Sequence, residues 1–83
     1  MRVQENVRAF IIDNFLFGED IGLKDDSSFL DGGFIDSTGI MQLVAYLEET
    51  YSIVIENEEL VPENLDSINK VTAFIERKAA LTG

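Results

Sequence analysis

The sequence predicts an all-α fold: a small four-helix bundle with three longer helices, one short third helix and a long loop between helices one and two. Apolar residues recur at helical spacing in three separate segments, and such spacing indicates helices with one face in a core. The β-branched run at residues 52–55 has no partner strand elsewhere. A chain of 83 residues has the length of one domain, which we expect to span residues 1–83.

The first helix is expected from about Arg2 to Leu16, where charged residues separate apolar ones. Its apolar positions are Val3, Val7, Phe10, Ile11 and Phe15. Residues 17–35 hold glycine, aspartate and serine and are expected to form a loop. A loop longer than about 15 residues is uncommon and often functional. We expect its apolar side chains to hold it to the core; they are Phe17, Ile21, Leu23, Phe29 and Leu30.

The second helix is expected from about Ser37 to Tyr51. Asp36 is its predicted N-cap, because a carboxylate there can accept a hydrogen bond from a free backbone N–H group of the first turn. The apolar positions fall on one face of this helix. They are Ile40, Leu43, Val44, Leu47 and Tyr51.

Two further helices are expected in the C-terminal part. Residues 52–55 should form an extended link that turns apolar side chains inward. A short third helix is expected to begin near Glu56–Asn57 and to end around Val61–Pro62. The last helix should start after Asp66 or Ser67, with apolar positions at Ile68, Val71, Phe74 and Ile75.

The chain is strongly acidic, with sixteen Asp and Glu, six Lys and Arg and a formal net charge of −10. Nucleic acids and anionic membrane surfaces attract clustered Lys and Arg, so we expect neither as a partner. The opening MRVQENVRAF lacks the apolar stretch of a signal peptide, and no apolar run reaches the roughly 18 residues of a membrane span. We therefore expect a cytoplasmic protein, and self-repulsion favours a monomer.

The acids are unevenly placed, because the interval between Lys24 and Lys70 holds eleven of them and no basic residue. Such an interval can simply form a solvated surface. It can also create a negative field that attracts basic docking patches on partner proteins.

Most catalytic chemistry is excluded, because the chain has no histidine and no cysteine. A Ser-His-Asp or Cys-His system and a His or Cys zinc site are therefore impossible. The stretch DDSSFLDGGFID fails as an EF-hand calcium loop in either glycine register. The adjacent acids Glu48–Glu49 and Glu58–Glu59 point in different directions and line no predicted pocket. We predict no catalytic residue, no metal ligand and no enzymatic turnover by this chain alone.

Ser37 is the remaining candidate for chemistry. It can be read as a polar residue at a helix start, where serine is common. Three features favour a chemical use: Asp36 already supplies the cap, a glycine-containing loop precedes the site, and Thr38 and Gly39 leave the hydroxyl uncrowded. A helix start also favours a bound phosphate. Because the chain lacks a histidine base, Ser37 would be the substrate of another enzyme rather than a catalytic nucleophile.

The stretch Asp31-Gly32-Gly33-Phe34-Ile35-Asp36-Ser37 resembles the D-x-G-x-x-D-S motif of the acyl carrier protein family, which includes peptidyl and aminoacyl carriers. The likeness continues to residues 63–68 and covers essentially the whole chain. The resemblance implies a four-helix bundle in which Ser37 carries covalent 4'-phosphopantetheine, transferred from coenzyme A by a phosphopantetheinyl transferase. Asp36 would cap the helix and help the transferase to recognise it. The thiol of the arm would hold acyl or aminoacyl groups as thioesters.

The resemblance also implies that partner enzymes dock through basic patches on the helix that follows the serine. The candidate docking residues are Thr38, Met41, Gln42, Ala45, Glu48 and Glu49. Apolar residues of the last two long helices should line the core and a cleft that admits part of an acyl chain; they are Leu43, Val44, Leu47, Phe74 and Ile75.

The sequence departs from the commonest fatty-acid-synthesis pattern, which places a leucine and then an acid after the serine, with another acid three residues later. Here Thr38, Gly39 and Gln42 stand at those positions, so the docking helix starts less negative and, through Gly39, intrinsically weaker. We infer a stand-alone carrier of a specialised lipid, polyketide or nonribosomal-peptide pathway, loaded by an acyl-activating ligase or synthase. The alternative is an acidic helical interaction module without a prosthetic group.

Overall fold

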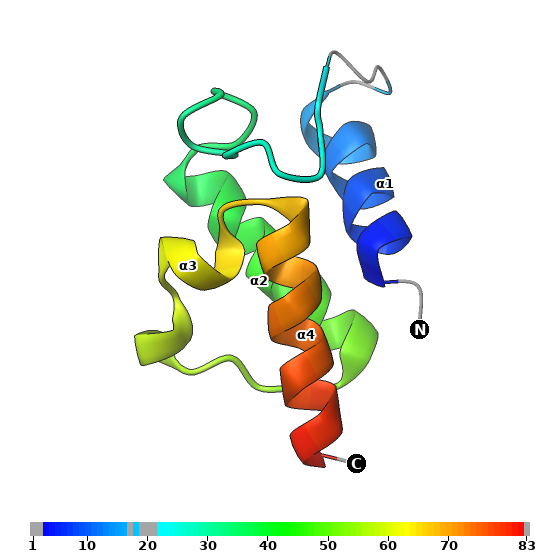
Figure 1. The fold of residues 1–83 in the computed structure, drawn as a ribbon, viewed down its shortest axis with the longest axis vertical. Helices are drawn as coiled ribbons and strands as arrows, with labels where there is room; N and C mark the ends of the chain where they lie inside the picture. The colour runs from blue at the N-terminus through cyan, green and yellow to red at the C-terminus, as the bar shows by residue number, and fades with distance from the viewer. Residues whose placement is uncertain (1–2, 17, 19–21, 83) are drawn as a thin grey trace.

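The computed structural model describes residues 3–16, 18 and 22–82 and shows a helical bundle (Figure 1). The three long helices are α1 (Val3–Phe15), α2 (Ser37–Tyr51) and α4 (Ile68–Thr82), whereas α3 (Pro62–Leu65) is a single turn. The described residues contain no strand, and none of their helices is long and apolar enough to pass through a membrane. The predicted all-α fold, with its long loop between α1 and α2, is confirmed.

Helix α2 begins and ends at the predicted residues, because the chain caps it at both ends. Asp36 is the N-cap, and its side chain accepts a hydrogen bond from the Gly39 N–H. At the other end Ser52 is left-handed, with φ 54° and ψ 47°, and its N–H donates to the Glu48 carbonyl. A left-handed residue ends a helix while satisfying one of its last carbonyl groups.

The core lies where α1, α2 and α4 meet the long loop. α4 packs against α1 and α3. The predicted core residues Leu43, Val44, Leu47, Phe74 and Ile75 are all buried, none more than 5% exposed.

The long loop is held to this core by fewer side chains than predicted. Leu23 and Phe29 are buried, at 4% and 0% exposure, which confirms two of the predicted anchors. Leu30 was expected to be a third and is 44% exposed, because the chain turns at residues 29–33 and leaves its side chain at the surface. The expected anchors Phe17 and Ile21 lie outside the described residues.

The extended link after α2 is confirmed. Ile53 and Ile55 are buried, whereas Val54 between them is 68% exposed. This alternation turns two of the three side chains into the core, as a strand-like backbone dictates.

The predicted boundaries of the short third helix are wrong. The stretch near Glu56 forms only a 3-10 turn, Asn57–Glu59, and α3 begins at Pro62, where the predicted helix ends. Proline suits the first position of a helix, because its fixed φ is helical and its missing N–H would have no partner there. Val61 before it is extended, with φ −128° and ψ 153°, as a residue before proline prefers.

Candidate functional site

Ser37 is the first residue of α2, and its side chain is exposed. The Oδ1 atom of Asp36 accepts a 2.8 Å hydrogen bond from the Gly39 N–H, which confirms the predicted cap. The first turn contains no acid, so no carboxylate within the helix offsets the positive end of its dipole. The hydroxyl of Ser37 therefore lies at the surface, beside a helix start that favours a negatively charged group.

The loop that delivers Ser37 is folded around the buried ring of Phe29. The Phe29 carbonyl accepts hydrogen bonds from the N–H groups of Phe34, at 2.9 Å, and Ile35, at 3.2 Å. Gly33 reverses the chain between them with φ 72°, a conformation that side chains disfavour. These contacts fix the residues immediately before the cap of α2.

Gly39 has a packing role that the sequence did not reveal. A Cβ atom on Gly39 would lie 2.4 Å from Cγ2 of Ile35 and 2.9 Å from Cε1 of Phe15. Both distances are far inside van der Waals contact, so only glycine lets α1 and the loop approach the first turn of α2 this closely. The helix-weakening glycine thus joins three segments beneath Ser37.

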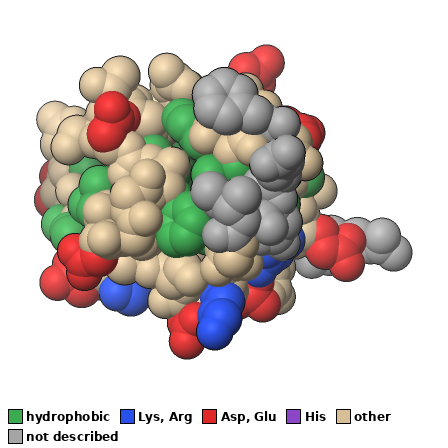
Figure 2. Space-filling model, turned by 90° about the horizontal axis from the view of Figure 1, so that it is seen from above, with side chains coloured by type: hydrophobic (Ala, Val, Ile, Leu, Met, Phe, Trp, Pro, Cys, Tyr) green, Lys and Arg blue, Asp and Glu red, His purple; other side chains and the backbone are tan. Residues whose placement is uncertain are grey.

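A cleft of about 300 Å³ opens beside Ser37, between the start of α2 and residues 60–66. Figure 2 views the end of the molecule where α2 begins and shows hydrophobic side chains across the middle of this face, with acids nearer its rim. The residues that line the cleft are Leu30, Ser37, Ile40, Met41, Leu60, Val61, Pro62, Leu65 and Asp66.

The cleft does not use the side chains that the sequence assigned to it. The five predicted residues, from Leu43 to Ile75, lie in the closed core and are absent from its lining. The wall comes instead from less buried positions such as Ile40 and Met41 of α2. Eight of the nine lining residues reach the surface at least in part, and Leu65 is buried.

Five of the six predicted docking residues are exposed on α2: Thr38, Met41, Gln42, Ala45 and Glu49. Met41 is 52% exposed and lines the cleft with Ser37. Glu48 is half-buried, and its Oε2 accepts a 2.9 Å hydrogen bond from the Ile55 N–H. One oxygen of Glu48 therefore holds the link after α2, a role that its sequence position does not indicate. Docking itself stays a prediction for all six.

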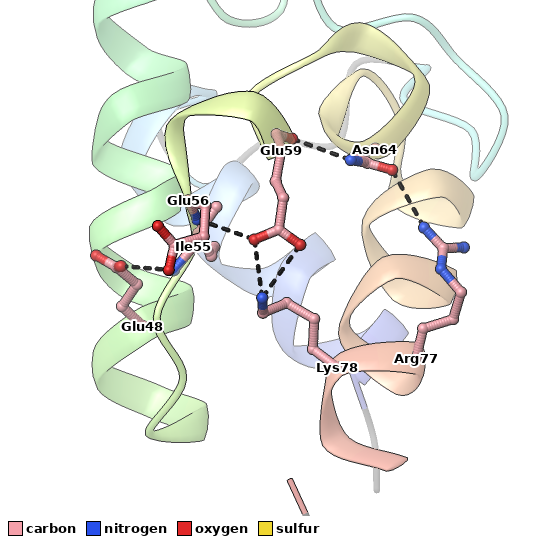
Figure 3. A network of polar contacts seen from close by, with 7 residues as sticks. All are labelled: Glu48, Ile55, Glu56, Glu59, Asn64, Arg77 and Lys78. Atoms are coloured by element: carbon pink, nitrogen blue, oxygen red, sulfur yellow. Dashed lines mark hydrogen bonds and ion pairs between the residues drawn. The ribbon is translucent and has the colours of Figure 1, made fainter. Parts of the chain in front are cut away.

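A polar network ties residues 56–64, which run beside and partly along the cleft, to α4 (Figure 3). Lys78 Nζ donates to both carboxylate oxygens of Glu59, at 2.8 and 3.1 Å, and the Glu56 N–H donates to Glu59 Oε1 at 2.9 Å. Asn64 Nδ2 donates to the Glu59 carbonyl, and Arg77 donates to Asn64 Oδ1. The hydrogen bond from Lys78, with that from the Glu56 backbone, lowers the pKa of the Glu59 carboxyl below 4.5.

This network predicts a loss of stability in acid. A lowered folded-state pKa means that Glu59 stabilises the fold fully above pH 4.5, and that this contribution is lost as pH falls through the folded-state pKa. Glu59→Gln should therefore be less stable than the wild type at pH 7, with the difference shrinking on acidification. Urea unfolding at several pH values measures this. Glu58→Gln, at an exposed position of the same turn, is the control, and an equal pH response in both variants would contradict the assignment.

Asp66 is the residue near the site that sequence reasoning missed. Its side chain accepts hydrogen bonds from Ser28 and Leu30, at sequence separations of 38 and 36 residues. No local pattern in one sequence indicates such partners. Among the described residues, no three His, Cys, Asp or Glu side chains gather where they could hold a metal ion.

Comparison with known proteins places this geometry among small carriers. No protein-family model matches the chain. The D-alanyl carrier protein of Streptococcus uberis is 35% identical over 67 residues, covering 78% of this chain and 85% of the relative. That of Lactobacillus acidophilus is 33% identical over 63 residues, covering 76% and 80%. That of Streptococcus suis is 31% identical over 75 residues, covering 90% and 92%.

One solved structure also resembles this fold. A chain in the crystal structure of an FAD-dependent dehydrogenase superposes with a TM-score of 0.73 and 26% sequence identity. The match covers 83% of this chain and 97% of that one. The matched chain is therefore close to this one in size, and the two share their helical arrangement.

Proposed function

This chain belongs to the carrier protein family, with D-alanyl carrier proteins among its relatives, and we propose that Ser37 is the residue to which its phosphopantetheine arm is attached. The observation that carries the proposal is the exposed Ser37 side chain at the capped start of α2. Once attached, the arm supplies the thiol that a chain without cysteine lacks. Acyl or aminoacyl groups held on it as thioesters would be presented to partner enzymes.

The residues around Ser37 fit such an arm. The Ser37 oxygen would form a phosphodiester with the pantetheine-bearing phosphate while the pyrophosphate bond of coenzyme A breaks and adenosine 3',5'-bisphosphate leaves. A base of the transferase would take the hydroxyl proton. The positive end of the α2 dipole, which the Asp36 cap shares, favours a negative charge at this position, typically by about 0.3–1 kcal/mol. The largely apolar cleft beside Ser37 can shield uncharged parts of the arm or its cargo.

Modification of the intact protein tests the proposal. After incubation with coenzyme A and a broad-specificity phosphopantetheinyl transferase, intact mass spectrometry should show one phosphopantetheine adduct on the wild type and none on Ser37→Ala. Thr38→Ala, which removes the neighbouring hydroxyl, should keep the adduct. An unmodified wild type would contradict the proposal and favour an interaction module without a prosthetic group. An adduct that survives in Ser37→Ala would place the arm elsewhere.

For the cargo, we propose an aminoacyl or specialised acyl group rather than a growing fatty acid. The names of the relatives make D-alanine the first cargo to test, and the first two turns of α2 carry no acid before Glu48. The holo protein should be loaded better by an adenylating ligase for D-alanine or another small acid than by fatty-acid synthase enzymes. Efficient loading by the synthase enzymes alone would reject this cargo class.

A further inference from the structure

We propose that Asp66, at the end of α3, is a positioning residue for the modification of Ser37. In this inference, which rests on the proposed function of Ser37, Asp66 holds the loop before α2 in the conformation that the transferase recognises. Asp66 itself does not contact the reacting atoms. It acts through the backbone of the loop.

Three consecutive loop residues donate hydrogen bonds to Asp66. Ser28 Oγ donates to Oδ2 at 2.5 Å, and the Leu30 N–H donates to Oδ1 at 3.1 Å. The Phe29 N–H donates to the Asp66 carbonyl at 2.8 Å. The Asp31 N–H then donates to Ser28 Oγ at 3.1 Å. One residue thus accepts at both carboxylate oxygens and at its backbone carbonyl, all from a single turn of the loop.

A series of contacts connects the hydrogen bonds at Asp66 to the start of α2. Phe29, bound to Asp66 through its N–H, accepts at its carbonyl from the N–H groups of Phe34 and Ile35. Ile35 is buried, at 3% exposure, and packs beneath Gly39 of the first helical turn. The next residue is the cap, Asp36. The position of the cap and of Ser37 is therefore coupled to Asp66 through contiguous packed and hydrogen-bonded groups.

The chemistry of the contact suits a positioning role. The donors that reach the Asp66 carboxylate are a hydroxyl and a backbone N–H, and hydrogen bonds to an ionised acceptor are both short and directional. Asp66 also lines the cleft together with Leu30 and Ser37. Removing the carboxylate would free the Ser28 hydroxyl and the Leu30 N–H and loosen this turn of the loop, while the backbone bond from Phe29 to the Asp66 carbonyl and the buried core would remain.

Steady-state kinetics of phosphopantetheine transfer test this role with three variants. Asp66→Ala should raise the KM of the transferase for the carrier about tenfold with little change in kcat, because binding weakens in proportion to the fraction of protein in the competent conformation. Asp66→Asn keeps an acceptor for the Leu30 N–H and should recover most of the loss. Glu76→Ala removes the same charge at an exposed position of α4 and should leave KM unchanged.

Amide hydrogen exchange distinguishes positioning from general destabilisation. In Asp66→Ala, exchange should rise at Phe29, Leu30 and Ile35, whereas core amides such as that of Val71 should keep their protection. An equal rise at all four positions, or a folded Asp66→Ala with wild-type KM, would overturn the inference.

A second variant serves if Asp66→Ala does not fold. Ser28→Ala removes the hydroxyl that links Asp66 to Asp31 and should give a smaller rise in KM with the same local pattern of exchange. Unchanged KM and exchange in Ser28→Ala would overturn the inference. An unmodified wild type would overturn the proposed function as well, whereas a modified wild type with insensitive variants would overturn the positioning role alone.

Discussion

Phe29→Ala should lower the free energy of unfolding by about 3–5 kcal/mol, the usual cost of removing a fully buried phenylalanine ring. The Phe29 side chain is 0% exposed, although it belongs to a loop. A domain of 83 residues has a total stability of roughly 4–12 kcal/mol. Phe29→Ala should therefore remove a large part of this total stability, because the loop folds around the Phe29 ring and would lose its anchor.

Urea unfolding followed by circular dichroism measures this loss. Leu30→Ala is the matched control, because it truncates the adjacent side chain at a position that is 44% exposed, and it should cost about 1 kcal/mol or less. The slope of the transition should stay similar in both variants if the native state remains compact. Equal losses for Phe29→Ala and Leu30→Ala would show that the loop does not depend on the buried ring.

Gly39→Ala should also destabilise the protein, although alanine is the better helix former by about 1 kcal/mol. The new Cβ would lie 2.4 Å from Cγ2 of Ile35 and 2.9 Å from a ring carbon of Phe15. Cγ2 branches directly from the Ile35 Cβ, so it can move away only if this buried side chain changes its χ1 rotamer or the backbone shifts. Overpacking of this kind costs about 1–3 kcal/mol, so the steric term should exceed the gain in helix propensity, with a net loss of up to about 2 kcal/mol.

The same urea measurement decides whether Gly39→Ala lowers or raises the free energy of unfolding. Gln42→Ala, at an exposed position of α2, is the control and should change stability by only a few tenths of a kcal/mol. Transfer of the arm to Ser37 should slow in Gly39→Ala, because Ile35 precedes the capping residue Asp36 and would be displaced with it. A Gly39→Ala variant more stable than the wild type would show that helix propensity dominates at this position.

The long helices were predictable because their information is local. The period of Leu43, Val44 and Leu47 defines the buried face of α2, and Asp36 marks its start through a bond that reaches only three residues, to Gly39. The exposed Ser37 follows directly from that cap. Rules of spacing and capping therefore sufficed to predict α2 and the position of Ser37 at its start, whereas the attachment role of Ser37 rests on the resemblance to carrier proteins and stays a prediction.

The rest depends on contacts between distant segments. Pro62 can end one helix or begin another, and the choice depends on how residues 57–65 pack against α4. Asp66 accepts hydrogen bonds from loop residues that lie 36 and 38 positions away in the sequence. Glu48, predicted as a docking residue, accepts a hydrogen bond from the Ile55 N–H with one carboxylate oxygen. A single sequence contains the donors and acceptors of these pairs but no signal of which will meet.

The start of α2 lies away from the end of α4, which has a practical consequence for attaching the protein to a support. α2 begins in the upper half of the molecule in Figure 1, whereas α4 ends at its lower end. A sensor chip or fluorescent label coupled just beyond α4 would leave the serine facing the solution. Immobilised protein could then report the arrival of a modifying enzyme in real time without the support blocking its approach.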